Sequence, residues 1–182
     1  MNRGELIAKL EAYGGCDAAD SACRERFLKF VREEPRCFER TRTPGHITGS
    51  AWVVDRARDR VILTLHKKLG RWLQLGGHAD GEEDVLVVAR REAREESGLE
   101  RVTPLSEEIF DIDIHEIPAF GPELPHLHYD VRFIFTAEDD APLKKTGESK
   151  AVSWVPVERI RDFSSERSIL RMAEKHRRRF VV

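Results

Sequence analysis

The chain has 182 residues and a mass of 20.9 kDa, which suits one compact domain with a small appendage. Its 31 basic and 33 acidic side chains nearly balance, so the composition argues against a strongly basic nucleic-acid binder. Apolar clusters throughout the chain argue against disorder, and no apolar run approaches the roughly 20 residues that span a bilayer.

The first part of the chain is predicted to be helical. Leu6, Leu10 and Tyr13 share one face of a first helix, which ends at the following glycine pair. A second helix, with Asp17 or Asp20 as its N-cap, is stopped by a proline. We therefore expect an N-terminal helical extension at 1–35 and a main domain at 36–182. The extension could cover a pocket or form the contact of a homodimer.

The cysteines and the N-terminus bear on where the protein works. The three cysteines at 16, 23 and 37 are an odd number, which argues against a disulfide framework. Their spacing with His46 matches no familiar zinc module, so ordinary thiols are favoured over a zinc site. No signal peptide is visible at the N-terminus. These features predict a cytoplasmic protein.

Short strands and helices alternate in the rest of the chain. Residues 36–48 look like a connection, and 51–54 and 61–65 look like a hairpin. Further strands are predicted at 109–117, 127–136 and 152–155, separated in part by a loop that contains Pro118, Pro122 and Pro125. Helices are predicted at about 82–97, which Gly98 ends, and from Ser164 or Ser165 to about 178. This mixture predicts an α/β sandwich with a mixed sheet.

The helix predicted at 82–97 carries an unusual stripe of carboxylates. At 100° per residue, the apolar stripe of Val85 and Val88 continues into Glu92, Glu95 and Glu96. A second apolar stripe, through Leu86, Ala89 and Ala93, would instead put the carboxylates at the edge of the buried face. Side chains at i, i+3 and i+4 are neighbours, so these three charges repel each other.

Two interpretations of the stripe remain open on periodicity alone. One is a solvated acidic patch, the usual fate of a Glu-rich helix. The other is a site for a hard divalent cation, Mg²⁺ or Mn²⁺, because carboxylate oxygens suit such ions better than they suit zinc. Since Mg²⁺ often binds substrate phosphates as well, the second interpretation indicates phosphate chemistry.

The residues around the stripe follow a longer pattern. Gly77, Glu83, Arg91, Glu92, Glu95, Glu96 and Gly98 fit the spacing G-x5-E-x7-R-E-U-x-E-E-x-G-U, with Ala93 and Leu99 at the aliphatic positions. The pattern runs without a gap and resembles a complete Nudix box, a far more specific signal than a lone glycine motif. Leu75 stands where many members of that family have a proline before the paired glycines.

The resemblance implies a fold and a chemistry. It implies the Nudix fold, an α/β/α sandwich, and hydrolysis of a nucleoside diphosphate linked to another group. It also implies that Glu92, Glu95 and Glu96 hold the metal ions, that the Gly77 carbonyl joins them, and that Arg91 and Glu83 orient the cluster. Glu95 or Glu96 could act as general base. Glu148, in a loop before a predicted strand, is another candidate for base or ligand, or else a solvated loop residue.

Candidate substrate contacts flank the box. Trp72 could stack on a base or anchor the core, Gln74 could bind substrate or its own loop, and His78 could touch phosphate, a metal-bound water or only the loop. In a strand, His126, His128, Asp130 and Arg132 share one face, which is either a solvent-facing surface or a pocket wall. We favour substrate contact for the two histidines.

Together these features predict a cytoplasmic, Mg²⁺- or Mn²⁺-dependent Nudix pyrophosphohydrolase. Its partner would be a small nucleotide substrate, with no membrane and no nucleic acid. Two alternatives are a Nudix module that senses a nucleotide without cleaving it and an RNA-end-processing enzyme. The intact glutamate set argues against the first, and the balanced charge argues against the second.

Overall fold

A computed structural model describes residues 1–15, 18–119, 121, 124–138 and 141–180. Cys16, Asp17 and Pro122 lie outside the described residues. The elements in chain order are α1 (Arg3–Ala12), α2 (Ala18–Glu33), β1 (Gly45–Val54), β2 (Arg60–His66), β3 (Trp72–Leu73), β4 (Leu75–His78), α3 (Val85–Ser97), β5 (Val102–Pro104), β6 (Asp111–Ile117), β7 (His126–Ala137), β8 (Ser149–Pro156), the 3₁₀ turn η1 (Val157–Asp162) and α4 (Arg167–Phe180).

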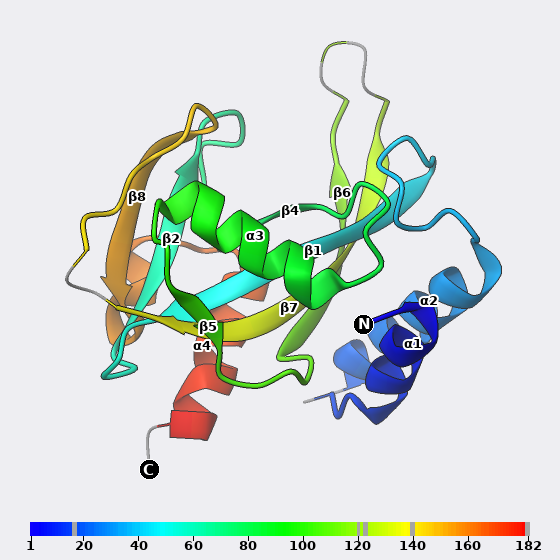
Figure 1. Cartoon of the computed structure of the whole chain (residues 1–182), viewed down its shortest axis with the longest axis horizontal. Helices are drawn as coiled ribbons and strands as arrows, with labels where there is room; N and C mark the ends of the chain where they lie inside the picture. Colours follow the sequence, from blue (N-terminus) through cyan, green and yellow to red (C-terminus); the bar gives the residue numbers. More distant parts are fainter. Residues whose placement is uncertain (16–17, 120, 122–123, 139–140, 181–182) are drawn as a thin grey trace.

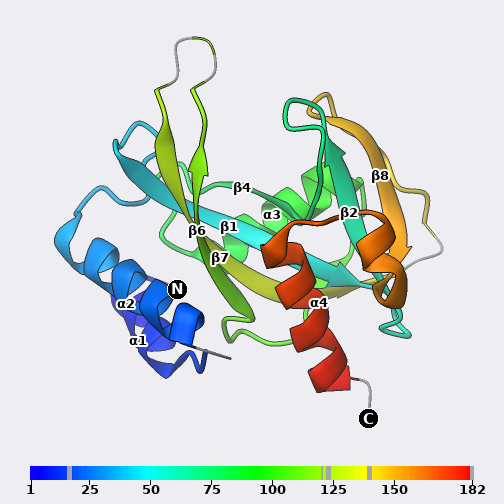
Figure 2. The same ribbon diagram turned by 180° about the vertical axis from the view of Figure 1, so that it is seen from behind.

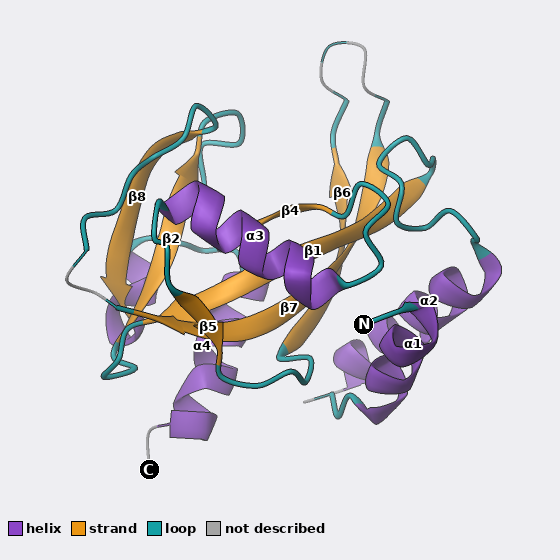
Figure 3. Ribbon diagram, in the orientation of Figure 1, coloured by secondary structure: helices purple, strands orange, loops and turns teal. Residues whose placement is uncertain are grey.

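The sheet is mixed and built around two long strands. β1 and β7 run parallel with ten residue pairs in register, from Gly45 with Leu127 to Val54 with Thr136. β1 also pairs with β2 and β4, and β7 with β5 and β6, all antiparallel, while β2 continues to β3 and β8. Figure 3 shows the two long strands passing behind α3. The predicted α/β fold with a mixed sheet is confirmed.

Helices cover both faces of this sheet. α3 lies across one face in Figure 1, and α4 lies on the opposite face, in front in Figure 2. One apolar cluster joins the α3 face to the N-terminal helices, and Phe30 of α2 stacks on Tyr129 of β7 at 3.8 Å between ring centroids. A second cluster joins Trp52 and Ile134 to α4. The sheet is therefore buried between two helical layers.

Most predicted elements are present, with two corrections. Strand β1 begins at Gly45, so 45–48 is not a connection as predicted. A Cβ at Gly49 would lie 2.8 Å from the Val85 carbonyl oxygen, so the glycine lets α3 approach the strand closely. Asp20 is not an N-cap, because it lies inside α2 and is only 2% exposed.

The α4 side of the sheet carries polar side chains in register across four strands. His46, Thr48 and Ser50 of β1 stand beside His128, Asp130 and Arg132 of β7. β6 adds His115, Asp113 and Asp111 to the same three rows, and His78 of β4 stands opposite Thr48. The prediction that 126, 128, 130 and 132 share a face agrees with this register. A solvent-facing surface is wrong for Asp130 and Arg132, because each is only 1% exposed.

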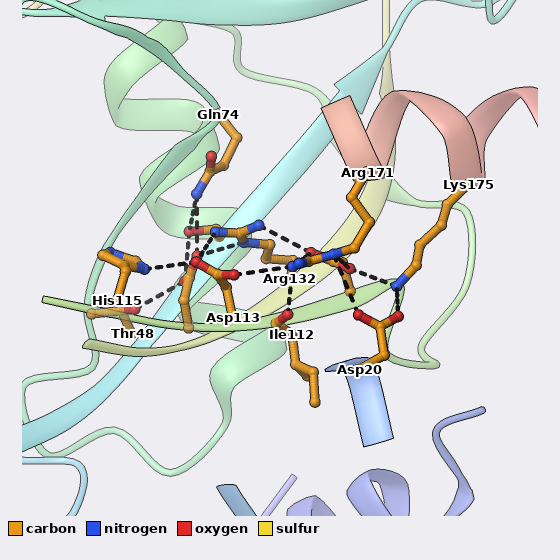
Figure 4. Close-up of polar contacts among 12 residues, drawn as sticks. Asp20, Thr48, Gln74, Ile112, Asp113, His115, Arg132, Arg171 and Lys175 are labelled. Atoms are coloured by element: carbon orange, nitrogen blue, oxygen red, sulfur yellow. Dashed lines mark hydrogen bonds and ion pairs between the residues drawn. The ribbon is translucent and has the colours of Figure 1, made fainter. Parts of the chain in front are cut away.

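The buried part of this face is an ion-pair network (Figure 4). Arg132 binds Asp130 at 2.7 Å and Asp111 at 3.0 Å. From α4, Arg171 binds Asp111 at 2.8 Å, and Lys175 binds the same carboxylate at 2.6 Å and Asp20 of α2 at 3.1 Å. The network thus ties α2 and α4 to the sheet. In the described part of the chain, no helix has the length and apolarity to cross a membrane.

Candidate active site

Helix α3 presents the carboxylates of the motif. Its N-cap is Asp84, whose side chain accepts a hydrogen bond from the Val87 N–H at 3.2 Å, and its C-cap is Gly98, in the left-handed conformation with φ of 73°. The buried side chains of α3 are Val85, Val88, Ala89, Ala93 and Ser97. Glu92 and Glu96 are half-buried at the border of this face, whereas Glu95 is exposed.

Glu96 is held against the glycine turn that precedes the helix. Its Oε2 accepts a hydrogen bond from the Gly76 N–H at 2.9 Å. Burial raises the pKa of Glu96 to about 7, the Gly76 N–H opposes this rise, and the charges of Glu92, Glu148 and Glu95 add to it. The same residues that the motif brings together therefore act on one another electrostatically.

Glu92 and Arg91 connect the helix to the other end of the turn. The Arg91 guanidinium donates to Glu92 Oε1 and to the carbonyl oxygen of His78, both at 2.8 Å. Burial raises the pKa of Glu92, which the Arg91 charge opposes and the Glu95 and Glu148 charges reinforce. A Cβ at Gly77 would meet the Glu92 carboxyl carbon at 2.5 Å. The turn therefore needs glycine at this position to accommodate the Glu92 carboxylate.

Replacing Gly77 by Ala tests this close approach. The new methyl group would push the Glu92 carboxylate away from the turn, and a misplaced ligand is expected to lower kcat/KM by about 10- to 100-fold. A steady-state assay with a phosphate-release readout measures this loss. Gly14→Ala is the matched control, because a Cβ there meets nothing within 4 Å and the residue lies outside the motif. Equal activity of both variants would contradict the packing argument.

Two further candidates are Glu148, which lies outside the box, and Glu83, which lies within it. Glu148 is exposed, yet its charge reaches both Glu92 and Glu96. The Glu83 carboxylate accepts a hydrogen bond from the backbone N–H of Arg3, at the start of α1, at 3.0 Å. Its orienting role, like the ligand and base roles of the other residues, stays a prediction.

Two of the predicted substrate contacts, Trp72 and Gln74, contact other residues of the fold. Trp72 packs edge-on against Phe163 at 5.5 Å between centroids and joins the apolar cluster under α4. The Gln74 amide nitrogen donates to Asp130 at 3.1 Å. Its buried Oε1 has no hydrogen-bond partner among the described residues. Their substrate roles stay predictions.

His78, His126 and His128 belong to a cluster that includes two histidines for which the sequence suggested no role. His46 lies 4.9 Å from both His126 and His128, and His115 lies 5.5 Å from His128, between ring centroids. Burial lowers the pKa of His78 to about 4 and that of His128 to about 2, with neighbouring imidazoles contributing. In the sequence, only the His126-x-His128 pair on one strand face indicated this cluster. The other three histidines come from three separate strands, so sequence spacing could not bring them together.

The donors around α3 fit a hard divalent cation, because they are carboxylate oxygens and the nearby backbone of Gly77. Burial and neighbouring negative charges raise the pKa of Glu92 and of Glu96, so their ionised forms are costly without a counter-ion. Among the described residues, however, the three-residue set whose ligand atoms all lie within 4.8 Å of one another is His46, His78 and His128, not the three glutamates. The glutamates are neighbours that do not converge on one point.

The raised pKa of Glu96 has a consequence for stability. Because the folded-state pKa, about 7, lies above the ordinary value of 4.5, the metal-free fold loses stability as the pH rises from about 4.5 to 7. Glu96→Gln removes this penalty. At pH 8 with a chelator, the variant is expected to be more stable than the wild type by about 1–3 kcal/mol, and at pH 4 nearly equal to it. Urea unfolding at both pH values measures the difference; a less stable variant at pH 8 would contradict it.

The mixed sheet, with helices on both faces and an acidic helix behind a glycine turn, forms an α/β/α sandwich (Figure 1 and Figure 2). A family model described as the NUDIX domain matches residues 45–177, and the chain therefore belongs to the Nudix hydrolase family. The resemblance found in the motif is confirmed. A search of curated proteins finds no match.

Solved structures agree with this assignment. A NUDIX-family hydrolase from Clostridium perfringens is 28% identical with a TM-score of 0.51, over 72% of this chain and 95% of that one. A C. elegans Ap4A hydrolase in a binary complex is 16% identical with a TM-score of 0.57, over 71% and 93%. The MutT protein from Methanosarcina mazei Go1 is 19% identical with a TM-score of 0.56, over 75% and 95%. The last two likenesses show the fold.

Proposed function

We propose that this Nudix hydrolase cleaves the pyrophosphate bond of a nucleoside diphosphate linked to another group, with Mg²⁺ or Mn²⁺ as its cofactor. The observation that carries the proposal is the half-buried Glu96, whose pKa is raised to about 7 beside three other carboxylates. Such a cluster is costly unless a cation binds there. Two structural neighbours support the substrate class, because one is an Ap4A hydrolase and the other is a dihydroneopterin triphosphate pyrophosphohydrolase.

Glu92, Glu95 and Glu96, with the Gly77 carbonyl, would hold the cation. A divalent ion held there would supply charge that polarises the phosphate and lowers the pKa of an attacking water. Arg91 keeps Glu92 and the His78 carbonyl in place through its two hydrogen bonds of 2.8 Å. Glu96, held by the Gly76 N–H, would take the water proton, with Glu95 and Glu148 as the other candidates for this base.

The substrate would approach along the turn that contains the paired glycines. Gln74, Trp72 and His78 lie on the stretch of chain that leads into and out of this turn and are proposed to contact the substrate. His126 and His128 are proposed to contact the substrate from β7. We also propose that α1 and α2 form an extension at 1–35 to the domain at 36–182, and that the protein is cytoplasmic. A homodimer remains part of this proposal.

A substrate screen tests the function. The purified protein is incubated with Mg²⁺ or Mn²⁺ and a panel of nucleoside diphosphate sugars, dinucleoside polyphosphates, nucleoside triphosphates and triphosphorylated RNA, and released phosphate or nucleotide is followed. We expect turnover of at least one small nucleotide, abolished by a chelator. Binding without any turnover would favour the sensing module, and turnover of RNA alone would favour the end-processing enzyme.

A further inference from the structure

Five of the seven histidines gather at one end of the α4 side of the sheet. They come from four strands: His46 from β1, His78 from β4, His115 from β6, and His126 and His128 from β7. The register of the sheet places His46 beside His128, and His128 beside His115. The cluster is therefore fixed by strand pairing and not by a flexible loop.

Three of these histidines present ligand atoms to one another. One ring nitrogen each from His46, His78 and His128 lies within 4.8 Å of the other two. A Zn²⁺ ion bound to imidazoles at about 2.0–2.1 Å in tetrahedral geometry holds its ligand nitrogens about 3.4 Å apart, so a small contraction closes the site. Three histidines also leave a fourth position for water or another ligand.

One ring nitrogen of His46 has no hydrogen-bond partner among the described residues. Its ring is only 2% exposed, and its Nδ1 lies 3.4 Å from the Arg42 carbonyl oxygen. Among the described residues, its buried Nε2 has no hydrogen-bond partner. Buried polar atoms are nearly always bonded, so an unpaired nitrogen among other imidazoles indicates a missing ligand.

The surroundings suit ligation by neutral imidazoles. The imidazoles of His46 and His128 must be neutral to bind a metal ion, and His46 is buried with one ring nitrogen that lacks a hydrogen-bond partner in the described part of the chain. The His46 contact with the Arg42 carbonyl oxygen resembles the outer contacts that orient metal-bound histidines. His78 and His128 are partly exposed, which gives an ion access from solvent.

We infer that His46, His78 and His128 form a second metal site, which takes a transition-metal ion such as Zn²⁺. Imidazole nitrogens select zinc, nickel and copper, whereas the carboxylates on α3 select magnesium and manganese. His126 flanks the site, with its Nε2 lying 3.3 Å from that of His128. The two sites thus differ in ligand type and lie on opposite sides of β4.

His78 and Arg91 connect the histidine site to the carboxylates of α3. His78 supplies its ring to the histidine site, while its carbonyl oxygen accepts from Arg91, which also binds Glu92. An ion on the ring would therefore fix the end of the glycine turn that carries Gly77. The bound ion would therefore position the glycine turn, and it would do so through His78.

Metal binding by the full chain tests the inference without any turnover. The metal-free protein is loaded with Zn²⁺ in excess Mg²⁺, which occupies the carboxylates, dialysed, and analysed for bound zinc. We expect one zinc per chain, and X-ray absorption at the zinc edge with three imidazole ligands at about 2.0–2.1 Å. No retained zinc, or a first shell made of oxygen, would overturn the inference even if the protein hydrolyses nucleotides.

Variants locate the ion. His46→Gln and His128→Gln are each expected to weaken Zn²⁺ binding by more than about 100-fold, because each removes a direct ligand. His66→Gln is the matched control, since His66 lies on β2, outside the cluster, and should leave zinc binding unchanged. Glu95→Gln should also leave it unchanged. If His46→Gln does not fold, the His128 variant and the wild-type absorption spectrum decide. Unchanged binding in the His128→Gln variant would overturn the assignment.

Discussion

Glu96→Gln is expected to lower kcat by about 10³-fold on whichever nucleotide the wild type hydrolyses. Glutamine keeps the shape of the side chain and can still accept the Gly76 hydrogen bond, so the turn and the helix should persist. It cannot carry the negative charge that a cation and a proton transfer both require. The loss should appear in kcat even at saturating Mg²⁺, measured by phosphate or nucleotide release.

The control for this variant lies just beyond the same helix. Glu100 is exposed and stands outside the motif, so Glu100→Gln should retain wild-type turnover. Circular dichroism and the higher metal-free stability expected at pH 8 would show that the Glu96 variant is folded. Full activity of a folded Glu96→Gln protein would refute both the ligand role and the base role assigned to Glu96.

The box was predictable because its geometry is local. Residues at i, i+3 and i+4 on one helix must be neighbours, so the placement of Glu92, Glu95 and Glu96 along α3 followed from spacing alone. The end of the helix at Gly98 followed from the need for a left-handed residue. The spacing did not predict how far each carboxylate is buried. In the structure Glu96 is half-buried, whereas Glu95 is exposed.

The start of β1 and the histidine cluster were not predictable because both depend on distant contacts. Gly45 and Gly49 have low strand propensity, yet ten paired positions on β7 and the close approach of α3 hold this segment in a strand. His46, His78 and His115 are far apart in the chain, and only sheet register brings them to His128. The same applies to Asp130 and Arg132, which are covered by the network that includes α4.

Arg132→Met is expected to destabilise the fold by about 3–5 kcal/mol. The methionine fills much of the same volume but leaves Asp130, Asp111 and Asp113 without the guanidinium that lies 2.7, 3.0 and 3.3 Å from them. Burial alone would raise the pKa of Asp113, and the hydrogen bond from His115 and the charges of Arg132 and Arg171 lower it instead. Removing Arg132 therefore leaves buried carboxylates that are incompletely compensated.

A surface pair provides the matched control for this substitution. Arg101 binds Glu138 with side chains that are 78% and 55% exposed, so Arg101→Met should cost less than about 0.5 kcal/mol. Urea unfolding at pH 7 measures both variants. Adding Asp130→Asn to Arg132→Met should restore part of the stability, because it removes one of the unpaired charges. Equal unfolding midpoints for Arg132→Met and the wild type would show that the network contributes nothing to holding α4 and α2 on the sheet.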